Sequence, residues 1–60
     1  MVDNESLVIT CEKTADRICA ELLISKHSEE YRKIVLYIAR IFDIQNNVKF
    51  DDNNVPYYVE

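Results

Sequence analysis

Apolar residues recur along residues 8–44 in two stripes, and a short polar stretch separates the stripes. Within each stripe, intervals of three, four and seven positions place the residues on one face of an α-helix. The first stripe consists of Val8, Cys11, Ala15, Ile18, Cys19, Leu22 and Leu23. The second stripe consists of Tyr31, Ile34, Val35, Ile38, Ala39, Ile41 and Phe42. The pattern predicts two amphipathic helices, over about residues 8–25 and about residues 28–44.

The two stripes do not continue one another along a single helix. If one helix ran through residues 25–28, the centre of the apolar face would shift by roughly 140° at that point. A long coiled-coil helix instead keeps one continuous apolar seam. We therefore expect a turn at residues 25–28 and a mainly α fold, in which an antiparallel two-helix hairpin brings the two stripes face to face.

The signals for the two helix starts differ in clarity. Ser28, which two glutamates follow, favours the start of the second helix, because its hydroxyl can accept a hydrogen bond from a free backbone amide. The start of the first helix stays open, since Thr10 can cap it, or Asn4 or Ser6 can cap a longer version. The β-branched residues within Leu7–Thr10 also allow a short strand there.

The tail, residues 45–60, contains two short β-type runs. Val48–Phe50 and Val55–Val59 flank the polar segment Asp51–Asn54, a pattern that predicts a short β-hairpin. Pro56 lacks a backbone N–H, so we expect its strand at an edge. Because an isolated two-stranded hairpin is only marginally stable in water, this hairpin should pack on the helices or pair with another chain. The alternative is an extended arm that docks on a neighbouring molecule.

Some large residues lie outside the stripes, Ile24 among them, and four of these residues are the candidate partner contacts. Leu36 and Tyr37 fall outside the second stripe, and Tyr57 and Tyr58 lie in the tail. Tyrosines are good anchors, because each has an apolar ring and a polar tip. Two interpretations stay open: the tail folds back over the leftover residues, or they form a contact between subunits.

The length of 60 residues predicts one small domain over residues 1–60, with a marginal core. Such cores rarely contribute more than about 3–5 kcal/mol to the free energy of unfolding, and many small domains also need a disulfide, a metal ion or a second subunit. Cys11 and Cys19 are separated by about 12 Å on one helix, which is too far for a disulfide within the chain and leaves only a disulfide between subunits. With a single histidine in the chain, we expect no metal site. Dimerisation is therefore the expected way to complete the core.

The composition narrows the possible function classes. The net charge of −4 disfavours nonspecific binding to nucleic acid or to a membrane surface, since both use basic patches. Glycine is absent, which excludes Gly-rich phosphate loops and leaves Asn or Asp for backbone positions of positive φ. No apolar run approaches the ~18 residues of a membrane span. The first residues also lack a signal-peptide pattern, so we expect a cytoplasmic protein.

Candidate chemistry is sparse. His27 lies in the predicted turn, and no nucleophile or carboxylate stands at a recognised catalytic spacing from it. The segment Asp51–Asn53 has the first ligands of a calcium loop, but the required glycine and the closing glutamate are missing. We therefore predict no enzymatic activity, no cofactor and no metal ion.

Surplus apolar surface without candidate chemistry predicts a small acidic protein-interaction module. It would regulate or inhibit a larger partner of unknown identity by surface occlusion, and would form a homodimer through its helices. The alternative is a dimeric DNA-binding regulator of helix-turn-helix or winged type, because helix, turn, helix and β-hairpin follow one another as in a winged helix. Arg32, Lys33 and Arg40 would then contact DNA, although the acidic loop Asp51–Asn54 suits phosphates poorly.

Overall fold

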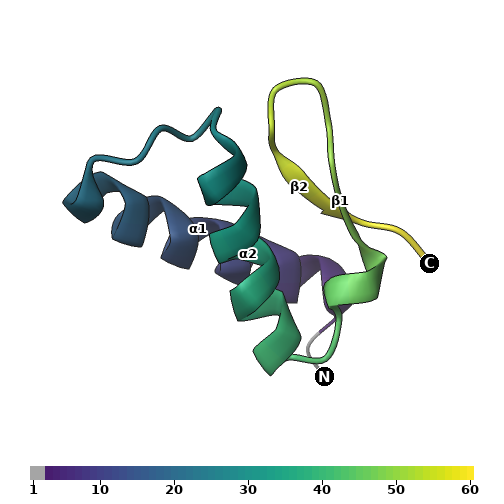
Figure 1. Cartoon of the computed structure of the whole chain (residues 1–60). Coiled ribbons are helices and arrows are strands. Elements are labelled where there is room, and N and C mark those ends of the chain that lie inside the picture. Colours follow the sequence, from purple (N-terminus) through teal and green to yellow (C-terminus); the bar gives the residue numbers. More distant parts are fainter. Residues whose placement is uncertain (1–2) are drawn as a thin grey trace.

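The computed structural model describes residues 3–60, which form two helices followed by a β-hairpin (Figure 1). In chain order the elements are α1 (Asn4–Leu22), α2 (Glu29–Ile41), the short 3-10 helix η1 (Gln45–Asn47), β1 (Val48–Phe50) and β2 (Pro56–Tyr58). The mainly α fold with a short two-stranded antiparallel sheet confirms the prediction at this level. Of the two alternatives for the tail, the chain forms the hairpin and not the extended arm.

The first helix begins earlier than its apolar stripe. The carboxylate of Asp3 accepts a hydrogen bond from the backbone amide of Ser6 at 2.7 Å and so caps α1. None of the three residues considered as caps has that role, since Asn4, Ser6 and Thr10 all lie within the helix. The alternative of a strand over Leu7–Thr10 is wrong, because the cap at Asp3 brings these residues into the first turns of α1.

The first helix also ends earlier than predicted. Its last residue is Leu22, and Leu23 adopts the left-handed backbone conformation with φ of 58°. The backbone amide of Ile24 donates to the carbonyl of Cys19 at 2.8 Å, which closes the helix end. Positive φ also occurs at Asp43 and Asn54, as expected in a chain without glycine. At Leu23 that expectation is wrong, because a leucine takes the left-handed position.

The second helix starts where the sequence predicts. The Ser28 hydroxyl accepts from the backbone amide of Tyr31 at 3.2 Å, and Glu29 and Glu30 occupy the first turn. The helix stops at Ile41, short of the predicted residue 44. The chain then turns, which brings Ile44 back into the core.

The hairpin has a simple antiparallel register, with Val48 opposite Tyr58 and Phe50 opposite Pro56. The Asp51 carboxylate organises the loop by accepting from the backbone amides of Asn53 at 2.8 Å and Val55 at 2.9 Å. Such short local hydrogen bonds are typical of Asp in turns. The predicted polar loop is therefore a structured turn.

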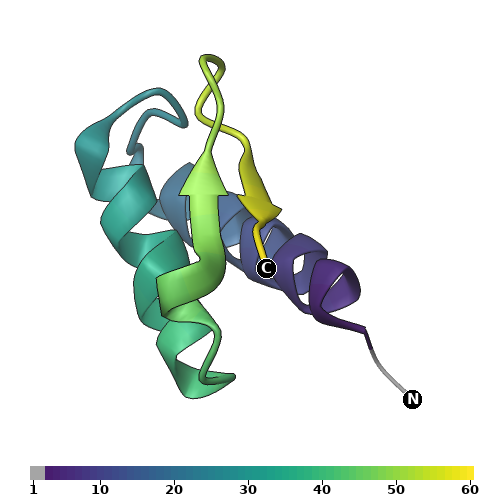
Figure 2. The ribbon, with the colours of Figure 1, turned by 90° about the vertical axis from the view of Figure 1, so that its right-hand side faces the viewer.

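The hairpin lies over both helices, and α2 crosses α1 obliquely (Figures 1 and 2). β2 packs against α1, and β1 packs against α2. The tail therefore folds back on the helices of its own chain.

The core between the helices and the hairpin is built mainly from small side chains. It consists of Val8, Cys11, Ala15, Cys19, Tyr31, Val35, Ala39, Ile44 and Val48. Of the eleven isoleucines and leucines, all of which lie within residues 3–60, only Ile44 is buried. Apart from Tyr31, the stripes therefore fill the core with their smaller members and leave most of the larger ones at or near the surface.

Candidate interaction surface

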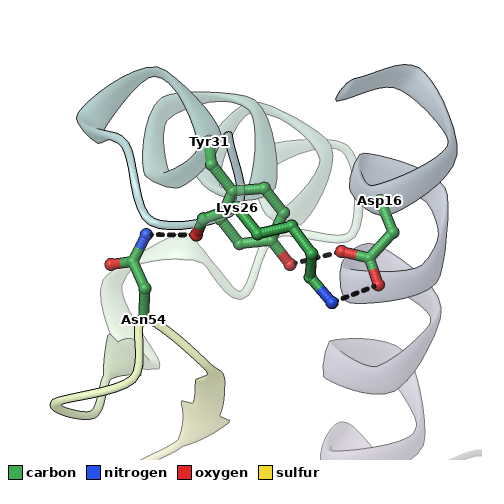
Figure 3. A network of polar contacts seen from close by, with 4 residues as sticks. All are labelled: Asp16, Lys26, Tyr31 and Asn54. Carbon is green, nitrogen blue, oxygen red and sulfur yellow. Dashed lines mark hydrogen bonds and ion pairs between the residues drawn. The ribbon is translucent and has the colours of Figure 1, made fainter. Parts of the chain in front are cut away.

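A polar network joins the two helices and the turn between them (Figure 3). The hydroxyl of the buried Tyr31 donates to Asp16 Oδ1 at 2.8 Å. Lys26 Nζ lies 3.3 Å from the other carboxylate oxygen of Asp16. Burial, together with the hydrogen bond to Asp16, raises the pKa of the Tyr31 phenol above its usual value of 10.0. The network holds α1, α2 and the turn in fixed relative positions.

Asn54 connects the hairpin to the same turn. Its side-chain amide donates to the backbone oxygens of Lys26 at 2.8 Å and Ser28 at 3.1 Å. Its side-chain oxygen accepts from Arg32 Nε. The Arg32 guanidinium also lies over the Phe50 ring, with 5.7 Å between the guanidinium carbon and the ring centre. Asn54 is buried, so these bonds satisfy a polar group that has little access to water.

An apolar groove lies between α2 and the C-terminal half of α1, and we name it the interhelical groove. It has a volume of about 370 Å³. Its lining consists of Ile18, Leu22, Lys33, Ile34, Tyr37 and Ile38. Lys33 is the one charged residue among the six, and the exposed lining is almost entirely apolar. Ile41 follows Ile38 by three positions and Tyr37 by four, so it extends the α2 side of the groove.

Several side chains along the interhelical groove are exposed, whereas Ile34 and Ile38 are half-buried and pack against the core. The exposed fractions are 63% for Leu22, 71% for Tyr37, 74% for Ile41 and 37% for Ile18. A single exposed apolar residue is ordinary on a protein surface. A cluster contributed by two helices is instead typical of a site where another molecule binds.

The end of α1 explains why the first stripe reaches the surface here. The chain leaves the helix at Leu23, and Ile24 rather than Leu22 packs against the core. Leu22 and Leu23 consequently remain exposed, although both belong to the stripe.

A second hollow of about 380 Å³ lies between the N-terminal half of α1 and β2. It is lined by Glu5, Val8, Ile9, Pro56, Tyr57 and Tyr58. This lining is more polar than that of the interhelical groove. Ile9 and Tyr57 are about equally exposed, at 50% and 47%.

The four residues predicted as partner contacts fall into two groups. Tyr37 and Tyr57 are exposed, but Tyr37 lines the interhelical groove and Tyr57 lines the second hollow. Leu36 and Tyr58 are half-buried and pack against the core of their own chain. The structure therefore does not bring the four together into one surface.

Sequence reasoning missed Ile18 and Leu22 as surface residues, because it assigned both to the buried face of the first helix. The run Leu22–Ile24 did contain one signal that part of the first stripe is exposed. Three consecutive apolar residues are spread over about 200° of a helix, so they cannot all face one core.

The three basic residues considered for DNA binding are also in different surroundings. Arg32 is engaged with Asn54 and Phe50, as described above. Lys33 and Arg40 are exposed on α2, and Lys33 lines the apolar groove. The structure therefore does not combine the three into one basic patch.

The side chains that could take part in catalysis or metal binding are either buried in the core or exposed to solvent. Cys11 and Cys19 are buried free thiols, and burial raises the pKa of both above 9.0, which disfavours the reactive thiolate. His27 is exposed in the turn. Within residues 3–60, no group of three or more His, Cys, Asp or Glu is arranged to hold a metal ion. No helix in that part of the chain has the length and apolar character to cross a membrane.

Comparisons with known proteins identify no relative of this chain. No protein-family model matches it, and neither a curated protein nor a solved structure matches it. The candidate site therefore rests on the geometry and exposure of the side chains along α1 and α2.

Proposed function

We propose that this protein is an interaction module that binds another protein chain through the interhelical groove and acts by covering part of that chain's surface. The observation that carries the proposal is the cluster of large, exposed apolar side chains from both helices around one groove. A protein that acts by covering part of its partner's surface needs a binding surface but no catalytic residue.

The anchors of the proposed contact are Leu22, Tyr37 and Ile41, which are the most exposed side chains of the cluster. Burying a fully exposed Leu or Ile is worth about 1.5–3 kcal/mol, so the exposed parts of Leu22 and Ile41 each offer about 1–2 kcal/mol. The acidic character of the rest of the molecule would influence which partner is accepted.

The test uses a photo-crosslinking phenylalanine analogue in place of Tyr37, in cells that produce the protein. We expect crosslinked adducts from this position, because its side chain is exposed within the proposed contact. The matched control places the same analogue at Val55, which is 40% exposed on the hairpin and outside the groove. Equal adducts from both positions, or none from position 37, would contradict the proposal.

DNA binding is a second proposal, which the order α1, turn, α2 and hairpin supports by analogy with a winged helix. Lys33 and Arg40 are exposed on α2 and would provide phosphate contacts. Titration of mixed-sequence duplex DNA at about 50 mM salt tests it, because phosphate contacts are strongest at low salt. No binding at this salt concentration would exclude it, and unchanged affinity when Lys33 and Arg40 are both replaced by glutamine would exclude these two residues as the contacts.

A further inference from the structure

We propose that the partner of the interhelical groove is a second copy of this chain, so that the protein is a homodimer with the two grooves at its centre. This inference rests on the proposed interaction function, because it names the partner for the same surface. The size of the core, the area of the exposed cluster and the distribution of charge each favour a second copy.

The core of one chain contains few of the large apolar side chains that the sequence provides. Ten of the eleven isoleucines and leucines remain partly or well exposed within residues 3–60. A 60-residue domain buries a smaller share of its surface than larger domains do, and a second subunit is one common way to add apolar burial. A dimer around the groove would bury Leu22, Tyr37 and Ile41, which one chain leaves in water.

The exposed cluster has the area that a small dimer interface needs. The exposed parts of Ile18, Leu22, Tyr37 and Ile41 amount to on the order of 400 Å² of apolar surface. Homodimer interfaces are about 65% apolar, so this area corresponds to about 600 Å² on each copy. The total of about 1,200 Å² is at the lower end of specific, stable interfaces.

The distribution of charge also favours self-association at this face. Two copies of a chain with net charge −4 repel each other across most of their surfaces. Five of the six residues that line the interhelical groove are uncharged and none is acidic, so two facing grooves would bring no carboxylates together, and only the two Lys33 side chains would repel each other.

The first experiment measures the molar mass of the full chain by light scattering during dilution from about 500 to about 5 μM, a range in which a small interface is expected to dissociate. We expect about twice the chain mass of 7.1 kDa at the highest concentration, with a decrease on dilution. Leu22→Glu should stay monomeric throughout. Ile9→Glu is the matched control on the same helix, since Ile9 is 50% exposed but lines the second hollow, and it should behave as the unmodified chain does.

A second measurement avoids substitutions that could impair folding. Methyl NMR spectra of the unmodified chain are recorded over the same dilution, and we expect the methyl groups of Ile18, Leu22 and Ile34 to shift while those of Ile9 and Val55 do not. A chain that is monomeric at the highest concentration would overturn the dimer, as would shifts confined to Ile9 and Val55. If that monomer still gave heavier adducts from position 37 in cells, the interaction function would stand and only the identity of the partner would be wrong.

Discussion

Leu23 holds a backbone conformation that leucine normally avoids. Its φ of 58° lies in the left-handed region, which costs an L-residue with a Cβ atom roughly 1–2 kcal/mol. Its side chain is 93% exposed and so gains little from packing within the chain. The position therefore imposes a local cost that the side chain does not offset.

We expect Leu23→Gly to stabilise the fold by about 0.5–1 kcal/mol, because glycine adopts the left-handed conformation freely and is the common residue at helix ends. Urea unfolding measures the change in the free energy of unfolding. Leu23→Ala is the control, since alanine keeps the Cβ atom and should give no gain. An equal gain from both variants would show that removal of the exposed side chain, and not the backbone, is responsible.

At the residue scale, the sequence predicted the helix start that depends on a local signal and missed the features that depend on packing. Ser28 was predicted correctly because its hydroxyl and the acidic residues after it act within one turn. The end of α1 was predicted too late, because the apolar period continues through Leu22 and Leu23. The helix stops there because Ile24 packs inward, which is a tertiary contact that periodicity does not reveal.

Asn54 connects elements that are far apart in the chain, and its side chain should contribute strongly to stability. Asn54→Gly keeps the positive φ but removes all three hydrogen bonds of the side chain, so we expect a loss of about 2–3 kcal/mol. Asn54→Ala should lose about 1 kcal/mol more, because alanine also resists the left-handed backbone. Urea unfolding of both variants separates the two effects, and a glycine variant as stable as the unmodified chain would contradict the bonding role.

The burial of Tyr31, together with its hydrogen bond to Asp16, should make the fold sensitive to high pH. Below about pH 10, the phenol is protonated in the folded and unfolded chain alike. Because the pKa of Tyr31 is raised in the folded chain, only the unfolded chain releases this proton as the pH rises above 10. The unfolded state is then favoured, and the free energy of unfolding should fall by up to about 1.4 kcal/mol per pH unit.

Tyr31→Phe tests this dependence. The variant should be less stable than the unmodified chain at pH 7, because it lacks the bond to Asp16, and its stability should decline less steeply above pH 10. Urea unfolding between pH 7 and pH 11 gives both quantities. Both proteins contain the buried thiols of Cys11 and Cys19, so the difference between them isolates the phenol. Parallel pH profiles would contradict the assignment.

At the element scale, periodicity predicted the two helices, and two β-type runs on either side of a polar segment predicted the hairpin, because both patterns follow from local geometry. The pattern could not predict which members of each stripe reach the surface, since that depends on how α2 crosses α1 (Figure 1). Tyr37 was selected as a partner contact because it lies off the stripe, and the structure leaves it exposed. Leu36 was selected for the same reason, but in the structure it packs against the core. Ile18 and Leu22 were not recognised as exposed residues.

At the scale of the whole molecule, self-association should couple stability to protein concentration. If two copies are joined through the interhelical groove, the midpoint of thermal unfolding should rise with concentration, because the folded dimer is favoured by mass action. Calorimetry or circular dichroism over about a hundredfold range measures this shift, while Leu22→Glu should show a constant midpoint. A constant midpoint for the unmodified chain would argue against the dimer.

The hydrogen bonds from Asn54 to the turn between the helices also order the events of folding. The two partners Asn54 and Lys26 are 28 positions apart, so this closure joins distant parts of a small chain. Distant closures form more slowly than a helix, which needs only neighbouring residues. During synthesis all residues of both helices are added before residue 54, and the turn can receive this restraint only after that. Exchange of the Asn54 side-chain amide protons during refolding would therefore report the docking of the hairpin, later than the formation of either helix.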